Sequence, residues 1–317
     1  MKSLHLIPLV LALLLLGVRG QSPAPASEVT ASTPSIRVSS NLVLVPVSVS
    51  DSGRKPVKDL DISAFKVTED GHPQTIASMQ QPGQSPVELA LLVDISGSVM
   101  TRFEFEQKAG SEFVRAIVGP QRFVSLFTVG PETRLVGQRT NDPATAQAAL
   151  LSLSPTREAT AFYDTLVSAA RYLRERASPF SRRVQVVISD GEDNYSLDHG
   201  LDSALRELQK ADCLFYSINP ASTSVRLNSL SRRGQEGLQF LANQTGGSAY
   251  LPDEWSELPS IYRMIVADLQ AQYLIGYYSS KTDTARDEYR KISVTVPGRP
   301  DLRVRARQGY YSSAGKG

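Results

Sequence analysis

Apolar and polar positions follow three successive patterns along the chain. From residue 37 to residue 85, apolar residues alternate with others at period two, which is typical of antiparallel β-strands. Between residues 86 and 270, continuous apolar runs are separated by segments with a helical period. Period-two alternation returns from residue 271 to residue 313, for example at Ile292 and Val294. The pattern therefore predicts one α/β segment between two segments of β-strands.

The middle segment predicts alternating strands and helices. Its first apolar run, residues 89–93, is long enough to be a strand that is buried on both faces. Alternation of this kind indicates a doubly wound, mostly parallel, Rossmann-like sheet that helices cover on both faces. We further expect the two flanking β segments to pair into one antiparallel β-sandwich, with the α/β domain inserted between them. The predicted helices lie near residues 105–117, 162–176, 199–210, 227–244 and 255–270, and the predicted strands near 89–93, 123–127, 184–188, 213–218 and 248–251.

The N-terminus has the pattern of a processing signal. Lys2 precedes an apolar stretch that is short for a membrane span, and a polar segment starts at Gln21. We expect a signal peptide over residues 1–20, cleaved after Gly20, which places the mature protein outside the cell or in the periplasm; an uncleaved anchor is the alternative. Residues 21–36 are rich in Pro, Ser, Ala and Thr and are expected to form a disordered leader.

The composition gives no indication of a nucleic-acid partner or of a second membrane-spanning segment. The 317 residues include 34 basic and 32 acidic side chains, so the formal charge of +2 gives no reason to expect nucleic-acid binding. No second long apolar run follows the N-terminal one, so no integral span is expected after signal cleavage. Cys213 has no other cysteine to pair with and is expected to be a small buried residue. These features leave the oligomeric state open.

Polar residues that can bind a metal follow the apolar runs. Ligands of open α/β sheets bind at the carboxyl ends of the parallel strands, so the residues directly after each run are the candidates. Two carboxylates and three hydroxyls lie there, which is a hard-oxygen set suited to Mg²⁺, with Ca²⁺ or Mn²⁺ as alternatives. Two charged ligands neutralise a divalent ion and leave a position for a carboxylate of a protein partner. The predicted metal ligands are Asp94, Ser96, Ser98, Thr160 and Asp190.

These residues resemble a known family. The segment D-I-S-G-S at residues 94–98 is similar to the D-x-S-x-S motif of von Willebrand factor type A domains and integrin inserted domains, which carry a metal-ion-dependent adhesion site. Thr160 in T-A-F-Y-D and Asp190 in I-S-D-G match the other two metal loops of that family. The resemblance covers residues 86–270 and implies that Ser96 and Ser98 coordinate directly. Asp94, Thr160 and Asp190 would contact the metal either directly or through a water molecule.

The flanks extend the resemblance. Segments such as V-P-V-S-V-S-D-S-G before the α/β segment and Q-Y-L-I-G-Y-Y after it are similar to a group of exported bacterial proteins with a type A domain in a β-rich frame. The implied function is a secreted, adhesion-type module that binds a protein ligand through its metal. The resemblance implies no enzyme activity and no catalytic residue.

Two other functions are alternatives to the adhesion-type module. A serine hydrolase would need a base near Ser96, but the surrounding sequence is not G-x-S-x-G, and His199 is expected to be a solvated residue at a helix start. An envelope scaffold or assembly protein with a mainly structural metal is the second alternative. Partner capture that depends on metal would separate it from the adhesion-type module.

Other charged residues have two interpretations each. Glu192 and Asp193 could add to the metal site, but acids ahead of a helix more often interact with the helix N-terminus. Arg303, Arg305 and Arg307 could hold an anion, although such a stripe is more often the solvated face of an edge strand.

Overall fold

The computed structural model of the protein describes residues 42–178, 180–220, 229–281 and 287–312. The expected signal peptide at residues 1–20 and the expected leader at residues 21–36 lie outside these ranges. None of the helices formed by the described residues combines the length and hydrophobicity needed to cross a bilayer.

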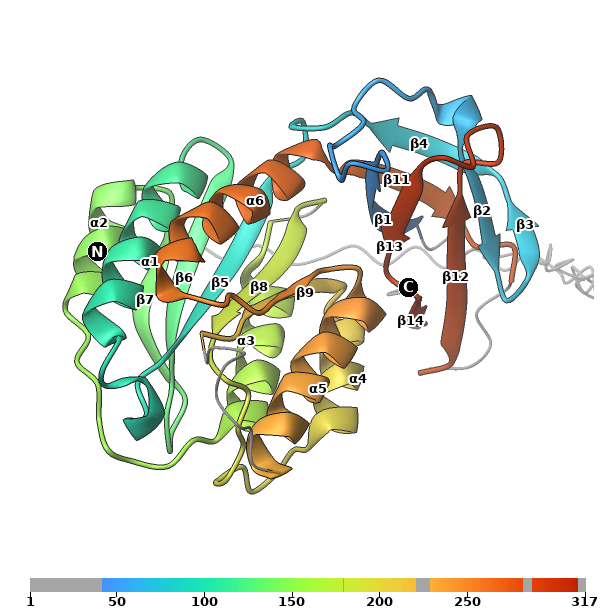
Figure 1. Cartoon of the computed structure of the whole chain (residues 1–317). Helices are drawn as coiled ribbons and strands as arrows, with labels where there is room; N and C mark the ends of the chain where they lie inside the picture. Colours follow the sequence, from blue (N-terminus) through green and yellow to red (C-terminus); the bar gives the residue numbers. More distant parts are fainter. Residues whose placement is uncertain (1–41, 179, 221–228, 282–286, 313–317) are drawn as a thin grey trace, which may run out of the picture. The chain divides into compact units, whose positions relative to one another are not determined.

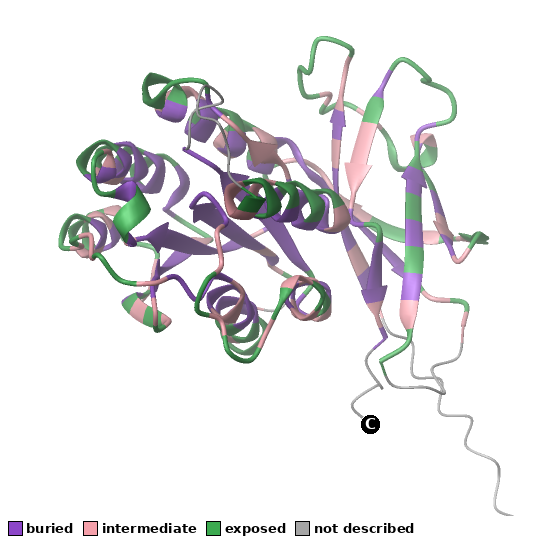
Figure 2. Cartoon of the chain, turned by 60° about the horizontal axis from the view of Figure 1, so that its bottom comes forward, coloured by how far each residue is buried: buried purple, intermediate pink, exposed green. Residues whose placement is uncertain are grey.

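A six-stranded sheet forms the centre of the α/β part, in the order β10-β9-β8-β5-β6-β7 (Figure 1). All residues of β5 are buried, which explains its unbroken apolar run. In Figure 2 the strands of this sheet are drawn mostly in purple, the colour of buried residues. β7 (Arg134–Thr140) runs antiparallel to β6 at one edge. The other strands are mutually parallel: β5 (Val87–Asp94), β6 (Arg122–Val129), β8 (Arg182–Ile188), β9 (Cys213–Ile218) and β10 (Ala249–Tyr250).

Helices cover both faces of this sheet (Figure 1). On β5, Leu89 and Leu91 face one hydrophobic core and Ala90 and Leu92 face the other, because successive side chains of a strand point to opposite faces. The first core is closed by α1 (Phe103–Ile117), α2 (Pro143–Leu151) and α6 (Leu258–Ala271), the last preceded by the 3-10 helix η3 (Trp255–Glu257). The second is closed by α3 (Phe162–Arg176), α4 (Leu201–Lys210) and α5 (Ser229–Thr245).

Two four-stranded antiparallel sheets are built from the flanks of the chain. One has the order β13-β1-β11-β4 and the other β14-β12-β2-β3, so each sheet combines strands from before and after the α/β segment. Their inward side chains, among them Val45, Val67 and Ile275, form a third hydrophobic core. The strands are β1 (Leu42–Ser50), β2 (Lys66–Glu69), β3 (His72–Gln74), β4 (Ile76–Gln80), β11 (Tyr273–Tyr278), β12 (Tyr289–Thr295), β13 (Arg303–Ala306) and β14 (Gly309–Tyr311), with the 3-10 helix η1 (Ile62–Ala64) before β2.

The predicted fold class is confirmed: a mostly parallel sheet covered by helices is inserted between strands that pair into antiparallel sheets. The pairing of β1 with β11, for example Val45 opposite Ile275, joins segments that are far apart in the sequence. Cys213 is buried at the start of β9, as expected. The proposed domain limits, with a frame of residues 37–85 and 271–313 around residues 86–270, remain a prediction.

The arginine stripe is not a solvated face throughout. Arg303 is exposed, but Arg305 pairs with Asp268 of α6, and Arg307 is only 5% exposed and pairs with Asp212. The Arg307 side chain also donates to the main-chain oxygen of Leu44 at 2.8 Å. Because their acidic partners lie elsewhere in the sequence, local alternation gave the wrong expectation for these two residues.

Candidate metal centre

Three loops meet at the carboxyl end of the central sheet. The first starts at Asp94, the last residue of β5, and the second follows Ile188, the last residue of β8, which is the parallel neighbour of β5. The third contains Thr160 and is tied to the end of β6, because the amide of Ala161 donates to the carbonyl of Gly130 at 2.8 Å. Two of the three loops therefore leave the neighbouring strands β5 and β8, and the third, which lies between α2 and α3, is bonded to the end of β6, the other neighbour of β5.

The first loop gathers three predicted ligands within one turn. The Asp94 carboxylate fixes the loop by accepting a hydrogen bond at Oδ1 from the amide of Ser96 at 2.9 Å. The hydroxyl oxygen of Ser96 lies 3.1 Å from that of Ser98. A short 3-10 helix, η2 (Gly97–Val99), completes the turn. Alternate residues thus converge, as their spacing predicted.

The second loop, which follows β8, is hydrogen-bonded to the first loop, which follows β5. The hydroxyl of Ser189 donates to Asp94 Oδ2 at 2.6 Å and accepts from the amide of Gly191 at 3.0 Å. Gly191 has a φ of 77°, a conformation that favours glycine. The loop also lies against α5: a Cβ atom added to Gly234 would be 2.8 Å from the carbonyl oxygen of Asp190. These contacts fix the backbone that carries Asp190.

The third loop is fastened to the second. Thr160 is buried, and its amide donates to the side-chain oxygen of Asn194 at 2.8 Å. Its carbonyl accepts from the amides of Asn194 and Tyr195, each at 3.1 Å. Sequence reasoning did not identify Asn194 as a residue that places Thr160, because an asparagine in a polar loop has many ordinary roles.

Buried carboxylates dominate the electrostatics of this end of the sheet. Asp94 is fully buried and Asp190 is 7% exposed. Burial raises the pKa of Asp94 to about 6, and the neighbouring charge of Asp190 adds to the rise, although the hydrogen bond from Ser189 opposes it. Burial likewise raises the pKa of Glu106 to about 7, against the attraction of Arg102. Ionised carboxylates in such a place need a compensating cation.

The donor set suits a hard divalent cation. Carboxylate and hydroxyl oxygens are the ligands that Mg²⁺, Ca²⁺ and Mn²⁺ take in proteins, and the set offers no thiolate or imidazole to a softer metal. Asp94, Ser96 and Ser98 lie in one loop, and the loops of Thr160 and Asp190 are hydrogen-bonded to their surroundings at the same edge. That these five side chains coordinate one ion remains a prediction.

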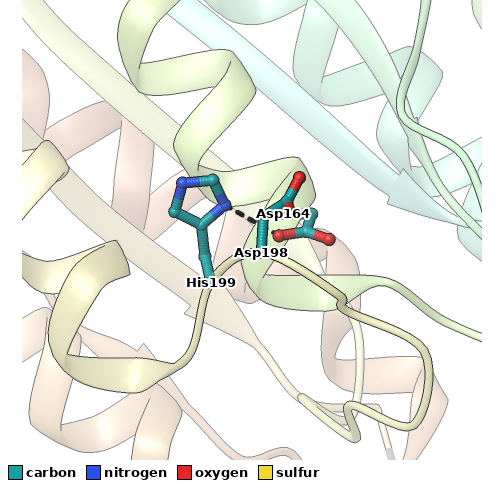
Figure 3. A group of neighbouring side chains, drawn as sticks. All are labelled: Asp164, Asp198 and His199. Carbon is teal, nitrogen blue, oxygen red and sulfur yellow. Dashed lines mark hydrogen bonds and ion pairs between the residues drawn. The ribbon is translucent and has the colours of Figure 1, made fainter.

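A second group of potential metal ligands lies at the start of α3. Asp164, Asp198 and His199 place their ligand atoms within 4.8 Å of one another (Figure 3). Both oxygens of Asp164 are engaged, Oδ1 with His199 Nδ1 at 2.8 Å and Oδ2 with the amide of Leu197 at 2.9 Å. The group thus fastens the loop before α4 to α3. His199, expected to be solvated, is an anchor of that loop.

The two acids after Asp190 have different contacts. Asp193 Oδ1 accepts from the amide of Phe162, the first residue of α3, at 2.8 Å. It therefore interacts with a helix N-terminus, as acids in such loops commonly do, although the helix is α3 and not the helix that follows in sequence. Glu192 accepts a hydrogen bond from the hydroxyl of Ser231 on α5.

The surroundings of Ser96 do not resemble an activated nucleophile. Its hydroxyl contacts the hydroxyl of Ser98, which is no base. His199 is paired with Asp164, and His72 lies in β3 of the antiparallel sheets. Among the described residues, no contact supplies Ser96 with a histidine of the kind a serine hydrolase uses.

Comparison with known families agrees with this geometry. Residues 89–192 match the family model of the von Willebrand factor type A domain. These residues belong to a von Willebrand factor type A domain. The match includes the five predicted ligands and ends at Glu192, two residues after Asp190. No curated protein was found to match the chain.

Solved structures resemble the type A domain at low sequence identity. An aerotolerance-related membrane protein from Bacteroides fragilis is 20% identical, with a TM-score of 0.47 over 58% of this chain and 98% of the other. A von Willebrand factor type A protein from Catenulispora acidiphila is 12% identical, with a TM-score of 0.48 over 87% and 74%. Proximal thread matrix protein 1 from the mussel byssus, with a zinc-occupied MIDAS motif, is 14% identical, with a TM-score of 0.50 over 64% and 50%. At 14% identity, the similarity to the byssus protein shows a shared fold alone.

Proposed function

We propose that the protein is a metal-dependent protein-binding module of the adhesion type. Asp94, Ser96, Ser98, Thr160 and Asp190 hold one divalent cation, and the cation binds an Asp or Glu carboxylate of a protein partner. The observation that carries this proposal is the pair of buried carboxylates, Asp94 and Asp190, beside hydroxyl oxygens at the carboxyl end of the sheet. Without a cation, their mutual repulsion would destabilise the fold.

The charge of the site favours an acidic ligand. Two carboxylates neutralise a divalent ion without exceeding its charge, so the ion still attracts an anionic oxygen. Mg²⁺ takes six oxygen ligands and retains water readily, which leaves a position that a partner carboxylate can occupy. The zinc-occupied MIDAS motif of the byssus protein supports metal binding at a motif of this kind. We expect Mg²⁺, with Ca²⁺ or Mn²⁺ as alternatives.

Exposed apolar side chains beside the site support a protein partner. Tyr195 is 48% exposed, and Leu197, in the same loop, is 82% exposed. Their loop does not depend on a partner for its shape, because hydrogen bonds to Thr160 and Asp164 hold it. Large apolar side chains on a fixed loop are available for contacts around the coordinated carboxylate.

The proposal is tested by capturing partners from native extract on immobilised protein, in Mg²⁺ or in chelator. We expect capture in Mg²⁺ and its loss in chelator or on Asp94→Asn. Asp61→Asn is the matched control, since Asp61 is exposed and makes no capping hydrogen bond. Capture that survives both chelator and Asp94→Asn would contradict the proposal. Loss of capture together with loss of the folded state in chelator would favour the scaffold with a structural metal.

Export is part of the same proposal. We propose that residues 1–20 are removed as a signal peptide and that the mature protein is secreted or periplasmic. N-terminal sequencing of the protein from the periplasm or medium should begin at Gln21. A mature chain that retains residues 1–20 would support the anchored alternative.

A further inference from the structure

In the part of the chain that the structure describes, only one of the two carboxylate oxygens of the buried residue Glu106 accepts a hydrogen bond. Glu106 lies in the first turn of α1 and is 1% exposed. Its Oε1 accepts a hydrogen bond from Arg102 Nε at 2.7 Å. Its Oε2 is buried and has no hydrogen-bond partner among the described residues, and the same holds for Arg102 Nη2. A buried ion pair that serves stability alone normally has these positions satisfied.

The charge of Glu106 acts on the predicted metal site. The charges of Asp94 and Asp190 both disfavour ionisation of Glu106, so the three carboxylates share one electrostatic environment. The guanidinium of Arg102 is the counter-charge in contact with Glu106. The charges of these three buried carboxylates act on one another, and only Glu106 is paired with the guanidinium. The excess of negative charge is one that a divalent cation would neutralise.

The three carboxylates do not lie close enough together for all of them to be direct ligands of one ion. Oxygens bound to one Mg²⁺ at about 2.1 Å are separated by at most about 4.2 Å. Asp94, Asp190 and Glu106 are not among the described groups whose ligand atoms all lie within 4.8 Å of one another. A water molecule on the metal can bridge such a gap, because Mg²⁺ keeps part of its water shell in proteins.

We propose that Glu106 is a positioning residue of the metal centre: its free oxygen accepts a hydrogen bond from a metal-bound water, and its charge strengthens the binding of the cation. This inference rests on the metal site of the proposed function and adds a residue to it. Arg102 holds the carboxylate in place through Oε1 and leaves Oε2 for the water. Loss of such an outer contact typically weakens metal binding by about 10- to 100-fold.

The test compares Mg²⁺ binding by calorimetry with thermal stability in chelator. Glu106→Gln keeps the shape and an oxygen for Arg102 but removes the charge. We expect it to bind Mg²⁺ about 10- to 100-fold more weakly while melting in chelator at or above the temperature of the wild type. Glu112→Gln is the matched control, because Glu112 is on the same helix, exposed and paired with Arg115; it should change neither quantity.

Other outcomes would overturn the inference. A structural ion pair predicts the reverse pattern, with a lower melting temperature in chelator and unchanged Mg²⁺ affinity for Glu106→Gln. Glu106→Asp keeps the charge and should lose less affinity than Glu106→Gln; equal losses would refute the charge contribution. Asp94→Asn separates the two proposals. If it abolishes Mg²⁺ binding and Glu106→Gln does not weaken it, the inference fails alone; if it leaves binding unchanged, the metal site itself is wrong.

Discussion

Replacing Asp94 by asparagine should stabilise the metal-free protein while removing metal binding. Asparagine has the shape of aspartate and keeps one oxygen, which can still accept from the amide of Ser96. Its NH2 group replaces the oxygen that accepts from the hydroxyl of Ser189, so that one hydrogen bond is lost. It removes a charge that is fully buried beside Asp190. The rise in the pKa of Asp94 from 3.8 to about 6 corresponds to a cost of about 3 kcal/mol for the ionised form in the folded state. Near pH 7.5, the variant avoids this cost.

The expected effect is large enough to measure by calorimetry. A domain of this size gains about 2–4 °C in melting temperature per kcal/mol, so Asp94→Asn should melt about 6–12 °C higher than the wild type in chelator at pH 7.5. Saturating Mg²⁺ should then stabilise the wild type and leave the variant unchanged. Asp61→Asn, at an exposed position, should behave as the wild type in both conditions.

Two results would refute this reasoning. If Asp94→Asn melts below the wild type in chelator, the buried carboxylate contributes more through its hydrogen bonds than it costs through its charge. If Mg²⁺ raises the melting temperatures of variant and wild type equally, Asp94 is no part of the metal site.

Three further predictions concern the same centre. Mg²⁺ at 100 times its dissociation constant should raise the free energy of unfolding of the wild type by about 2.7 kcal/mol, and denaturant titration with and without chelator measures this. Because the folded-state pKa values of Asp94 and Glu106 are raised to about 6 and 7, metal-free protein should lose stability as pH rises from about 4 to 7, and Mg²⁺ should reduce this loss; a melting temperature that rises over this range in chelator would contradict it. Gly234→Ala should destabilise the protein by about 1–3 kcal/mol and weaken Mg²⁺ binding, since the added Cβ meets the carbonyl of Asp190. Gly200→Ala, whose Cβ would meet nothing within 4 Å, should do neither.

Periodicity predicted those elements whose sequence pattern matches their packing. The helix expected at residues 162–176 is α3 (Phe162–Arg176), and the apolar run at 89–93 lies in β5. Both have a clear pattern because one side of the helix and both faces of the strand are covered. The expectation that the flanks pair was confirmed through β1 and β11, although sequence alone does not show which strand lies beside which.

Two elements of the α/β part were missed because their patterns are weak. α2 is largely alanine and leucine, so its sequence shows no polar face. β7 is an edge strand in which exposed and partly buried residues alternate irregularly around Gly137, and its pairing with β6 shifts in register. Short elements of this kind are determined by the surface they pack on.

The candidate ligands could be selected from sequence because strand ends define where ligands bind. Glu106 could not, since an acid in the first turn of a helix usually interacts with the helix N-terminus. Its burial depends on how α1 packs at the end of the sheet. For the same reason the ion pairs of Arg305 and Arg307, with partners more than 30 residues away in the sequence, were not foreseen.

The most direct test of the central claim is a crystal structure with Mn²⁺ in place of Mg²⁺, with anomalous difference density used to locate the ion. The account predicts one strong peak among the oxygens of Asp94, Ser96, Ser98, Thr160 and Asp190. A peak at the Asp164, Asp198 and His199 group and none between the three loops would contradict it.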